Sequence, residues 1–165
     1  LCYVSSRDIR PYHPLINDNF KRHITMKILL AADGSPFTKK ALGWLLANHS
    51  FDGTDDELVI LNVQAPMPPR VRAVLPAETV KGYYQDEALK VLAPIDKFMK
   101  RHTTKFSIHS ATGNPAEEII RLAKKQKVHL IVMGTHGRGM LGQAIMGSVA
   151  QRVVADSPTP VLLIK

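Results

Sequence analysis

The sequence predicts an α/β fold, namely a single doubly wound domain with a five-stranded, mainly parallel sheet in the strand order 3-2-1-4-5 and helices on both faces. Short apolar runs of strand length alternate along the chain with amphipathic segments of helical period. Most of the runs are apolar throughout rather than at every second residue, which is typical of parallel strands buried on both faces. The 165 residues, 45% of them hydrophobic, suffice for one core.

The strands follow from these runs. Four runs with at most one polar residue each read as central strands, at residues 27–32, 58–63, 128–133 and 161–164. The run at 105–111 alternates polar and apolar residues, so we expect a half-exposed strand near an edge.

Four helices are expected between or after the strands. Ser35-Pro36 combines an N-cap with proline at the first helical position, and Asn114 and Ser148 stand at equivalent starts of the third and fourth helices. The second helix keeps a 3.6-residue period over 80–99, with a kink expected at Pro94.

Two segments stand apart from this alternation. Residues 1–25 are broken by prolines and polar residues, so we interpret them as an appended, poorly ordered extension, non-native in origin, and 26–165 as the domain. Residues 64–76 contain four prolines, which predicts a stiff connection lying over the ligand edge of the sheet.

Composition narrows the cellular setting and the partners. Cys2 is the one cysteine, and the chain shows neither a secretory signal nor an apolar run of the roughly 18 residues that span a bilayer. We therefore expect a cytoplasmic protein that does not bind a membrane. The net charge of +8 raises nucleic acid as a partner, but the basic residues are dispersed at presumed helix ends, so we expect none.

Open parallel sheets bind ligands at the carboxyl ends of their strands, where the strand order reverses, so the loops after the first and fourth strands are the places to search. The loop after the fourth strand contains Gly137, Gly139 and Gly142 in a dinucleotide-type spacing. That motif belongs in the first strand-to-helix turn, and only one strand follows here, which excludes it. A P-loop is excluded as well, because no Gly-Lys-Ser or Gly-Lys-Thr occurs.

A second pattern in the same loop is Gly134-x2-Gly137-x9-Gly147-Ser148. With it, and with Asp33-Gly34-Ser35 after the first strand and the closing segment 157–164, the chain resembles the ATP-binding branch of the universal stress protein family over 26–165. The resemblance implies a bound ATP. It implies the following binding residues: Ala31, Asp33, Val63, Met133, Gly134, His136, Gly137, Arg138, Gly147, Ser148 and Val149.

The physical chemistry of the loop agrees with that implication. Glycines let backbone amides approach phosphate oxygens, and Gly147-Ser148 opens a helix whose unpaired amides and dipole favour an anion. Ser148 is suited equally to donating its hydroxyl to phosphate and to capping the helix. Arg138 is either a cation for the phosphates or an exposed loop arginine.

The other implied residues also have two interpretations. The carboxylate of Asp33 is placed to accept ribose hydroxyls or to help hold a magnesium ion on the phosphates, while the alternative is a turn that only starts a helix. The resemblance implies that Ala31 and Val63 frame the adenine, with Met133 alongside, but burial alone would explain these three residues.

The seven histidines show no metal-ligand spacing, so we expect no dedicated metal site. His136 differs by its place in the glycine loop. It either donates to a phosphate or is simply solvated.

We expect a regulatory ATP-binding protein of the stress response, without a catalytic role. The resemblance further implies a homodimer paired through the strand at 161–164, which would protect an open edge. Two other functions remain open, namely a slow ATPase or phosphotransferase and a module that binds only protein partners or a second copy, without nucleotide.

Overall fold

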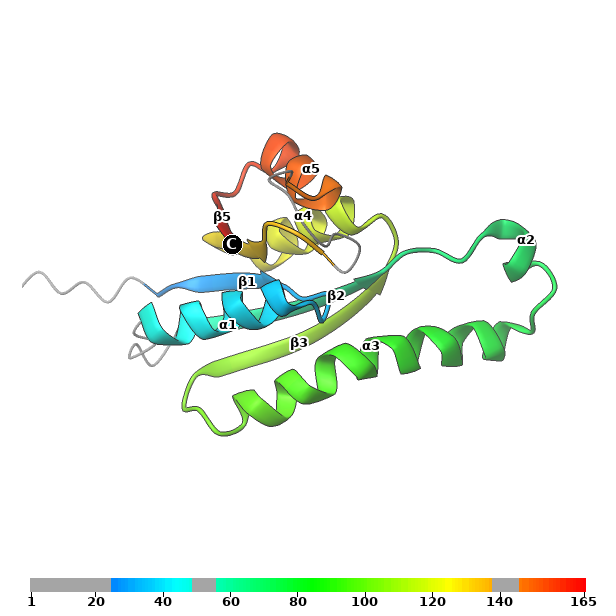
Figure 1. Ribbon diagram of the computed structural model, residues 1–165, viewed down its shortest axis with the longest axis horizontal. Coiled ribbons are helices and arrows are strands. Elements are labelled where there is room, and N and C mark those ends of the chain that lie inside the picture. The colour runs from blue at the N-terminus through cyan, green and yellow to red at the C-terminus, as the bar shows by residue number, and fades with distance from the viewer. Residues whose placement is uncertain (1–24, 49–55, 138–145) are drawn as a thin grey trace, which may run out of the picture.

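The computed structural model describes residues 25–48, 56–137 and 146–165, and its centre is a five-stranded sheet in the order β3-β2-β1-β4-β5 (Figure 1). Every strand pairs in parallel with its neighbours. The predicted fold class and strand order are therefore confirmed. The strands are β1 (Lys27–Ala31), β2 (Glu57–Gln64), β3 (Lys105–Thr112), β4 (Leu130–Gly134) and β5 (Val161–Ile164).

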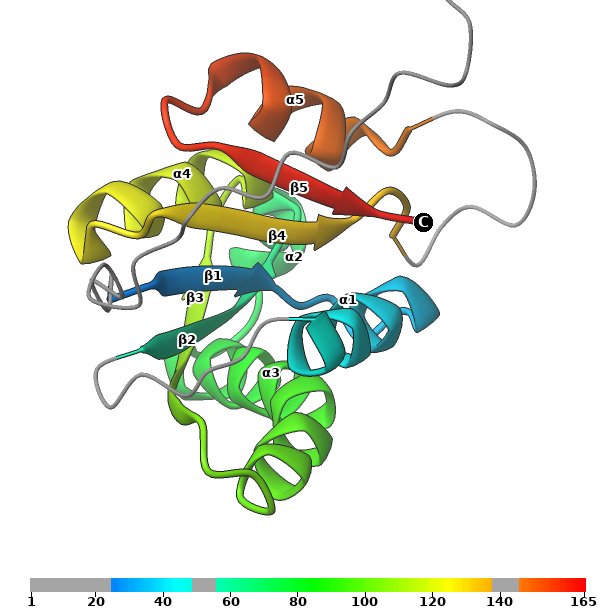
Figure 2. The same cartoon turned by 90° about the vertical axis from the view of Figure 1, so that its left-hand side faces the viewer.

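Helices cover both faces of the sheet (Figure 2). They are α1 (Pro36–Asn48), α2 (Pro69–Arg72), α3 (Ala77–Met99), α4 (Pro115–Gln126) and α5 (Ser148–Asp156). Buried residues of α1 and α3 form one core with the sheet, and those of α4 and α5 form the other. Within the described residues no helix is long and apolar enough to cross a membrane.

The alternation of side chains along each strand supplies both cores at once. In β1, Ile28 and Leu30 pack toward α1 and α3, whereas Leu29 packs toward α4 and α5. This two-sided burial explains why the strands are apolar at successive residues. The description of 161–164 as a central strand is wrong, because β5 lies at an edge, where the predicted strand order 3-2-1-4-5 places it. Its run is apolar since both of its faces are helix-covered.

A polar cluster fixes the amino ends of the first three strands. Lys27, Glu57 and Lys105 stand in one register row across β1, β2 and β3. The Lys27 ammonium lies 2.9 Å from the Glu57 carboxylate, and the Ser107 hydroxyl donates to the same carboxylate at 2.8 Å. The hydrogen bond from Lys27, with that from Ser107, lowers the pKa of Glu57 below its usual value of 4.5, although partial burial opposes the shift.

The predicted helix caps are confirmed in two of three cases, and the third helix start, at Gly147-Ser148, lies where predicted but has a different cap. The Ser35 hydroxyl accepts from the Thr38 amide at 3.3 Å, and the Asn114 side chain accepts from the Ala116 amide at 3.1 Å. The capping role considered for Ser148 is wrong, since Gly147 is the N-cap of α5 and Ser148 is its first helical residue. Helix α3 begins at Ala77, three residues before the predicted start, and continues through Pro94.

The connection after β2 differs from the prediction. Residues 65–76 contain the short helix α2, and Figure 1 shows this segment extending with the start of α3 away from the sheet. Its backbone is tied to α3 where the Met67 amide donates to the Tyr84 hydroxyl at 2.6 Å. None of residues 65–76 lines the cavity described below, so the expectation that this connection covers the ligand edge is wrong. The extension assigned to 1–25 lies outside the described residues except for Thr25.

Candidate functional site

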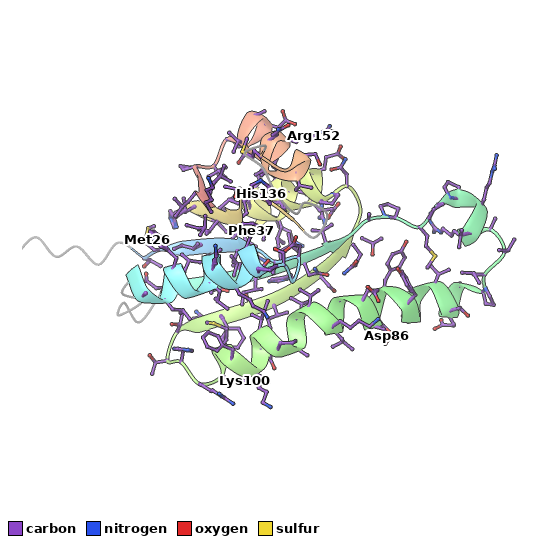
Figure 3. All side chains as sticks on the ribbon, viewed as in Figure 1. Met26, Phe37, Asp86, Lys100, His136 and Arg152 are labelled. Atoms are coloured by element: carbon purple, nitrogen blue, oxygen red, sulfur yellow. The ribbon has the colours of Figure 1, made fainter. Side chains whose placement is uncertain are left out.

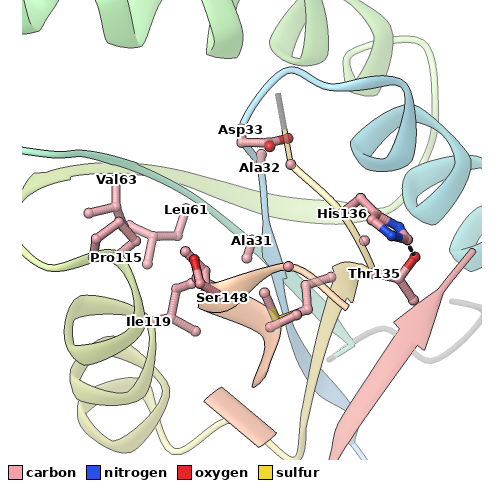
Figure 4. A pocket seen from close by; sticks show the side chains of 16 residues that line it. Ala31, Ala32, Asp33, Leu61, Val63, Pro115, Ile119, Thr135, His136 and Ser148 are labelled. Carbon is pink, nitrogen blue, oxygen red and sulfur yellow. Dashed lines mark hydrogen bonds between the residues drawn. The ribbon is translucent and has the colours of Figure 1, made fainter. Parts of the chain in front are cut away.

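A cavity of about 370 Å³ opens at the carboxyl ends of β1 and β4, where the strand order reverses (Figure 4). A cavity of this size is typical of small-molecule sites. Its walls come from β1, β2, β4, the loops that follow β1 and β4, and the amino ends of α4 and α5. The cavity therefore lies at the predicted place.

The inner part of the cavity is apolar. Side chains from the sheet meet side chains from the first turns of α4 and α5, and all of them belong to or pack against the core on that face. They are Ala31, Leu61, Val63, Ile119, Met133, Val149 and Ala150. Such a surface suits a flat apolar group such as a nucleobase, whose polar edge would then meet the backbone.

Two of the three glycines at the rim are required by close packing. A Cβ on Gly134 would lie 2.4 Å from the Cβ of Phe37, so packing of α1 on the loop requires glycine there. A Cβ on Gly137 would lie 3.0 Å from Oδ2 of Asp33, so the loop approaches this carboxylate closely.

Gly147 has neither requirement. Its backbone angles, φ −61° and ψ 148°, are open to any residue, and among the described residues a Cβ would make only ordinary contacts, the nearest at 3.4 Å from the Thr135 carbonyl oxygen. The described part of the chain thus leaves room for a side chain at the wall of the cavity. A bound group that needs the space would explain its absence.

The amino ends of α4 and α5 both face the cavity, but their first backbone amides differ in whether a side chain accepts hydrogen bonds from them. In α4 the Asn114 side chain accepts from the amides of Ala116 and Glu117. In α5, as far as the described residues show, no side chain caps the first turn, and the hydroxyl of Ser148 is exposed at the cavity. Unpaired amides at a helix start carry a partial positive charge, so the start of α5 is suited to an anion.

Asp33 lies across the rim from this helix start (Figure 4). Its Oδ1 accepts from the Ser35 amide at 2.9 Å and from the Thr38 hydroxyl at 2.7 Å. The carboxylate thus takes part in the turn that starts α1, a role treated above as an alternative to ligand binding. The two roles are compatible, because Oδ2 is directed toward Gly137.

His136 is held rather than solvated. Its Nδ1 lies 2.9 Å from the hydroxyl of Thr135, and its ring packs on Phe37 with the centroids 5.1 Å apart. Figure 3 shows the two rings coming from the glycine loop and from α1. Lys40 stands over the outer face of Phe37, 5.7 Å from its centroid. The side chain of His136 is thereby fixed at the rim.

The structure brings ten of the eleven predicted site residues together around one cavity. They are Ala31, Asp33, Val63, Met133, Gly134, His136, Gly137, Gly147, Ser148 and Val149. Arg138 lies outside the described residues. Among the residues that line the cavity and that the structure describes, Asp33 is the one carboxylate, and the described chain holds no cluster of three or more potential metal ligands.

Sequence reasoning missed six lining residues, namely Ala32, Leu61, Pro115, Ile119, Thr135 and Ala150. The predicted strand order could have located Pro115 and Ile119 at the cavity. With strand order 3-2-1-4-5, right-handed crossovers place α4 and α5 on the same face, so the start of α4 must border a cavity at the start of α5.

Comparison with known proteins decides the family. The Universal stress protein family matches residues 25–165, a range that includes every residue that the structure describes. The chain belongs to the universal stress protein family. A universal stress protein of Thermus aquaticus is 34% identical over 84% of this chain and 97% of its own length. The universal stress protein YxiE of Bacillus subtilis is 31% identical over 84% of this chain and 98% of its own length.

Solved structures of the family share the fold. The MJ0577 protein of Methanocaldococcus jannaschii, a universal stress protein, superposes with a TM-score of 0.73 at 29% identity, over 84% of this chain and 94% of its own. An Arabidopsis thaliana family protein with AMP bound shares 20% identity at a TM-score of 0.62, over 85% of this chain and 91% of its own. A universal stress protein in complex with cAMP shares 22% identity at a TM-score of 0.58, over 85% of this chain and 97% of its own.

Proposed function

We propose that this universal stress protein binds ATP in the cavity and acts as a regulatory protein of the stress response, with nucleotide occupancy biasing its interactions. The observation that carries the proposal is the juxtaposition at one rim of Asp33, the Gly134–Gly137 turn and the start of α5, which no side chain among the described residues caps. The phosphate oxygens of ATP would accept hydrogen bonds from backbone amides of the turn and of the helix start, and the ribose would face the carboxylate of Asp33.

The wider cavity agrees with an adenine nucleotide. Its apolar inner part is large enough for a purine, while the polar groups stand at the rim. AMP and cAMP, the ligands of the two fold relatives named above, contain adenine, ribose and phosphate as ATP does. Asp33 would be the residue that helps to hold a magnesium ion accompanying the phosphates.

A catalytic role has less support. Efficient phosphoryl transfer needs a positioned nucleophile or water and strong charge neutralisation, commonly by lysine or arginine together with magnesium. Among the described residues lining the cavity, Asp33 and His136 are the ionisable side chains. We expect turnover of ATP far below the enzyme median of roughly 10 per second. A steady-state rate near that median would replace the regulatory proposal with an enzymatic one.

Calorimetric titration with ATP tests the binding proposal. We expect saturable binding at one site per chain, and AMP and cAMP titrated in parallel measure how much the outer phosphates contribute. A flat titration with all three nucleotides would overturn the proposal in favour of a module that binds only proteins.

We further propose a homodimer paired through β5. The carbonyls of Pro160 and Ile164 accept hydrogen bonds from backbone amides of β4, so the even-numbered residues of this segment pair with β4. The amides of Val161 and Leu163 therefore face away from the sheet, at its open edge. The opposite edge, β3, carries polar residues at alternate positions, whereas β5 is apolar throughout. An apolar strand with outward amides is the edge that a second copy would cover.

Sedimentation of two variants tests the dimer. Leu163→Ala and Leu163→Pro both lose the side chain, but only the proline variant also loses the outward amide. We expect a dimer that is weakened in the alanine variant and dissociated in the proline variant. A monomeric wild type, or a proline variant no weaker than the alanine variant, would contradict pairing through β5.

A further inference from the structure

Thr38 is a buried polar residue that does not line the cavity, with 3% of its surface exposed in the first turn of α1. Its hydroxyl donates to Oδ1 of Asp33 at 2.7 Å and accepts from the Asp33 amide at 3.1 Å. The single hydroxyl therefore holds both the side chain and the backbone of Asp33.

These bonds set the direction of the carboxylate. With the bond from the Ser35 amide, Oδ1 accepts two hydrogen bonds from the start of α1. Two bonds to one oxygen fix the side-chain torsions, so Oδ2 is turned away from the helix and toward Gly137 at the cavity rim. Removing the hydroxyl of Thr38 would take away the shorter of these two hydrogen bonds to Oδ1 and the bond to the Asp33 amide, which weakens the hold of α1 on the carboxylate.

We propose that Thr38 is a positioning residue, which orients Asp33 so that its Oδ2 accepts a hydrogen bond from a sugar hydroxyl of the nucleotide. This inference rests on the proposed function. Thr38 acts through Asp33 and contacts no part of the ligand. The affinity for nucleotides with a complete ribose therefore depends on a side chain buried behind the site.

Three variants separate positioning from packing. Thr38→Val keeps the volume but loses the hydroxyl, and Thr38→Ser keeps the hydroxyl but loses the methyl group. We expect Thr38→Val to weaken ATP binding about three- to tenfold, the range for one lost hydrogen bond. Thr38→Ser should bind within about twofold of wild type even where its thermal midpoint falls. Should Thr38→Val fail to fold, Thr38→Ala takes its place with the same expected loss.

Two further measurements distinguish positioning of Asp33 from a merely structural role of Thr38. First, 2′,3′-dideoxy-ATP lacks the sugar hydroxyls, so Thr38→Val should bind it as well as wild type does. Second, in an Asp33→Ala background the change at Thr38 should cause no further loss of ATP affinity.

Each outcome has one meaning. Wild-type ATP affinity in Thr38→Val, an equal loss for ATP and dideoxy-ATP, or an additive loss in the Asp33→Ala background would each overturn the positioning role. Failure of the wild type to bind ATP would instead overturn the proposed function itself.

Discussion

Adding a side chain at Gly147 should strongly weaken nucleotide binding while leaving the protein folded. The backbone of this residue is in the β region, and a Cβ would meet no atom of residues 25–48, 56–137 or 146–165 closer than 3.4 Å. Replacing glycine at an N-cap by alanine costs up to about 1 kcal/mol, and the lower entropy of the unfolded chain returns about 0.4–1 kcal/mol. The free energy of unfolding of Gly147→Ala should thus stay within about 1 kcal/mol of wild type.

The effect on affinity should be much larger. The new side chain stands beside the first amides of α5, where a phosphate must approach to accept from them. Each hydrogen bond to a charged group contributes about 1.5–3 kcal/mol. Losing one predicts at least about tenfold weaker ATP binding for Gly147→Ala, and losing two predicts more than about a hundredfold for the branched Gly147→Val.

Calorimetry with ATP and thermal unfolding of the same preparations measure the two effects. Gly43→Ala is the matched control, because a Cβ there meets nothing within 4 Å on the exposed side of α1. It should raise the free energy of unfolding by about 1 kcal/mol and leave ATP affinity unchanged. A folded Gly147→Val protein that binds ATP as tightly as wild type would refute the reasoning.

Two predictions concern stability. Gly134→Ala should destabilise the protein by about 1–3 kcal/mol, because the added methyl would overlap Phe37. An unchanged melting temperature would contradict this prediction and show that α1 shifts at little cost. Glu57→Gln should lower the free energy of unfolding by about 0.5–1.5 kcal/mol at neutral pH. The bonds from Lys27 and Ser107 depress the folded pKa of Glu57, so its stabilisation is present above the unfolded pKa of 4.5 and is lost as the pH falls through the folded value. Urea unfolding of both proteins should therefore show a gap at neutral pH that closes in acid, and a gap independent of pH would contradict this assignment.

Much of the fold follows from the local pattern. The largely apolar runs located β1, β2, β4 and β5, and the alternating run located β3, because burial on two faces or one face leaves a direct trace in the sequence. The run of β5 is as apolar as those of the central strands because its residues pack against both cores, although all four of them are only partly buried.

The extension after β2 was missed for a different reason. The four residues of α2 are too few to show a helical period, and its prolines read as a stiff connection. The first turns of α3 are largely exposed, so they carry only a weak apolar pattern before Ala88, its first buried residue.

The candidate site was predictable in outline but not in its supports. The strand ends and glycine spacing located its rim, whereas the packing of Phe37 on Gly134 and of His136 on Phe37 joins segments about a hundred residues apart. Such contacts depend on how α1 settles against the loop after β4, which a single sequence does not encode locally. The bonds from Thr38 to Asp33 are local, but a threonine in a first helical turn has many other uses.

The central claim is that backbone amides of the Gly134–Gly137 turn and of the start of α5 donate hydrogen bonds to the phosphates of ATP. Amide chemical shifts recorded during an ATP titration of isotope-labelled protein report on those groups one by one. We predict the largest shifts at Gly134, Gly137, Ser148 and Val149, with little change along α3. Shifts that cluster on α3 or β3 while these four amides stay still would contradict the account.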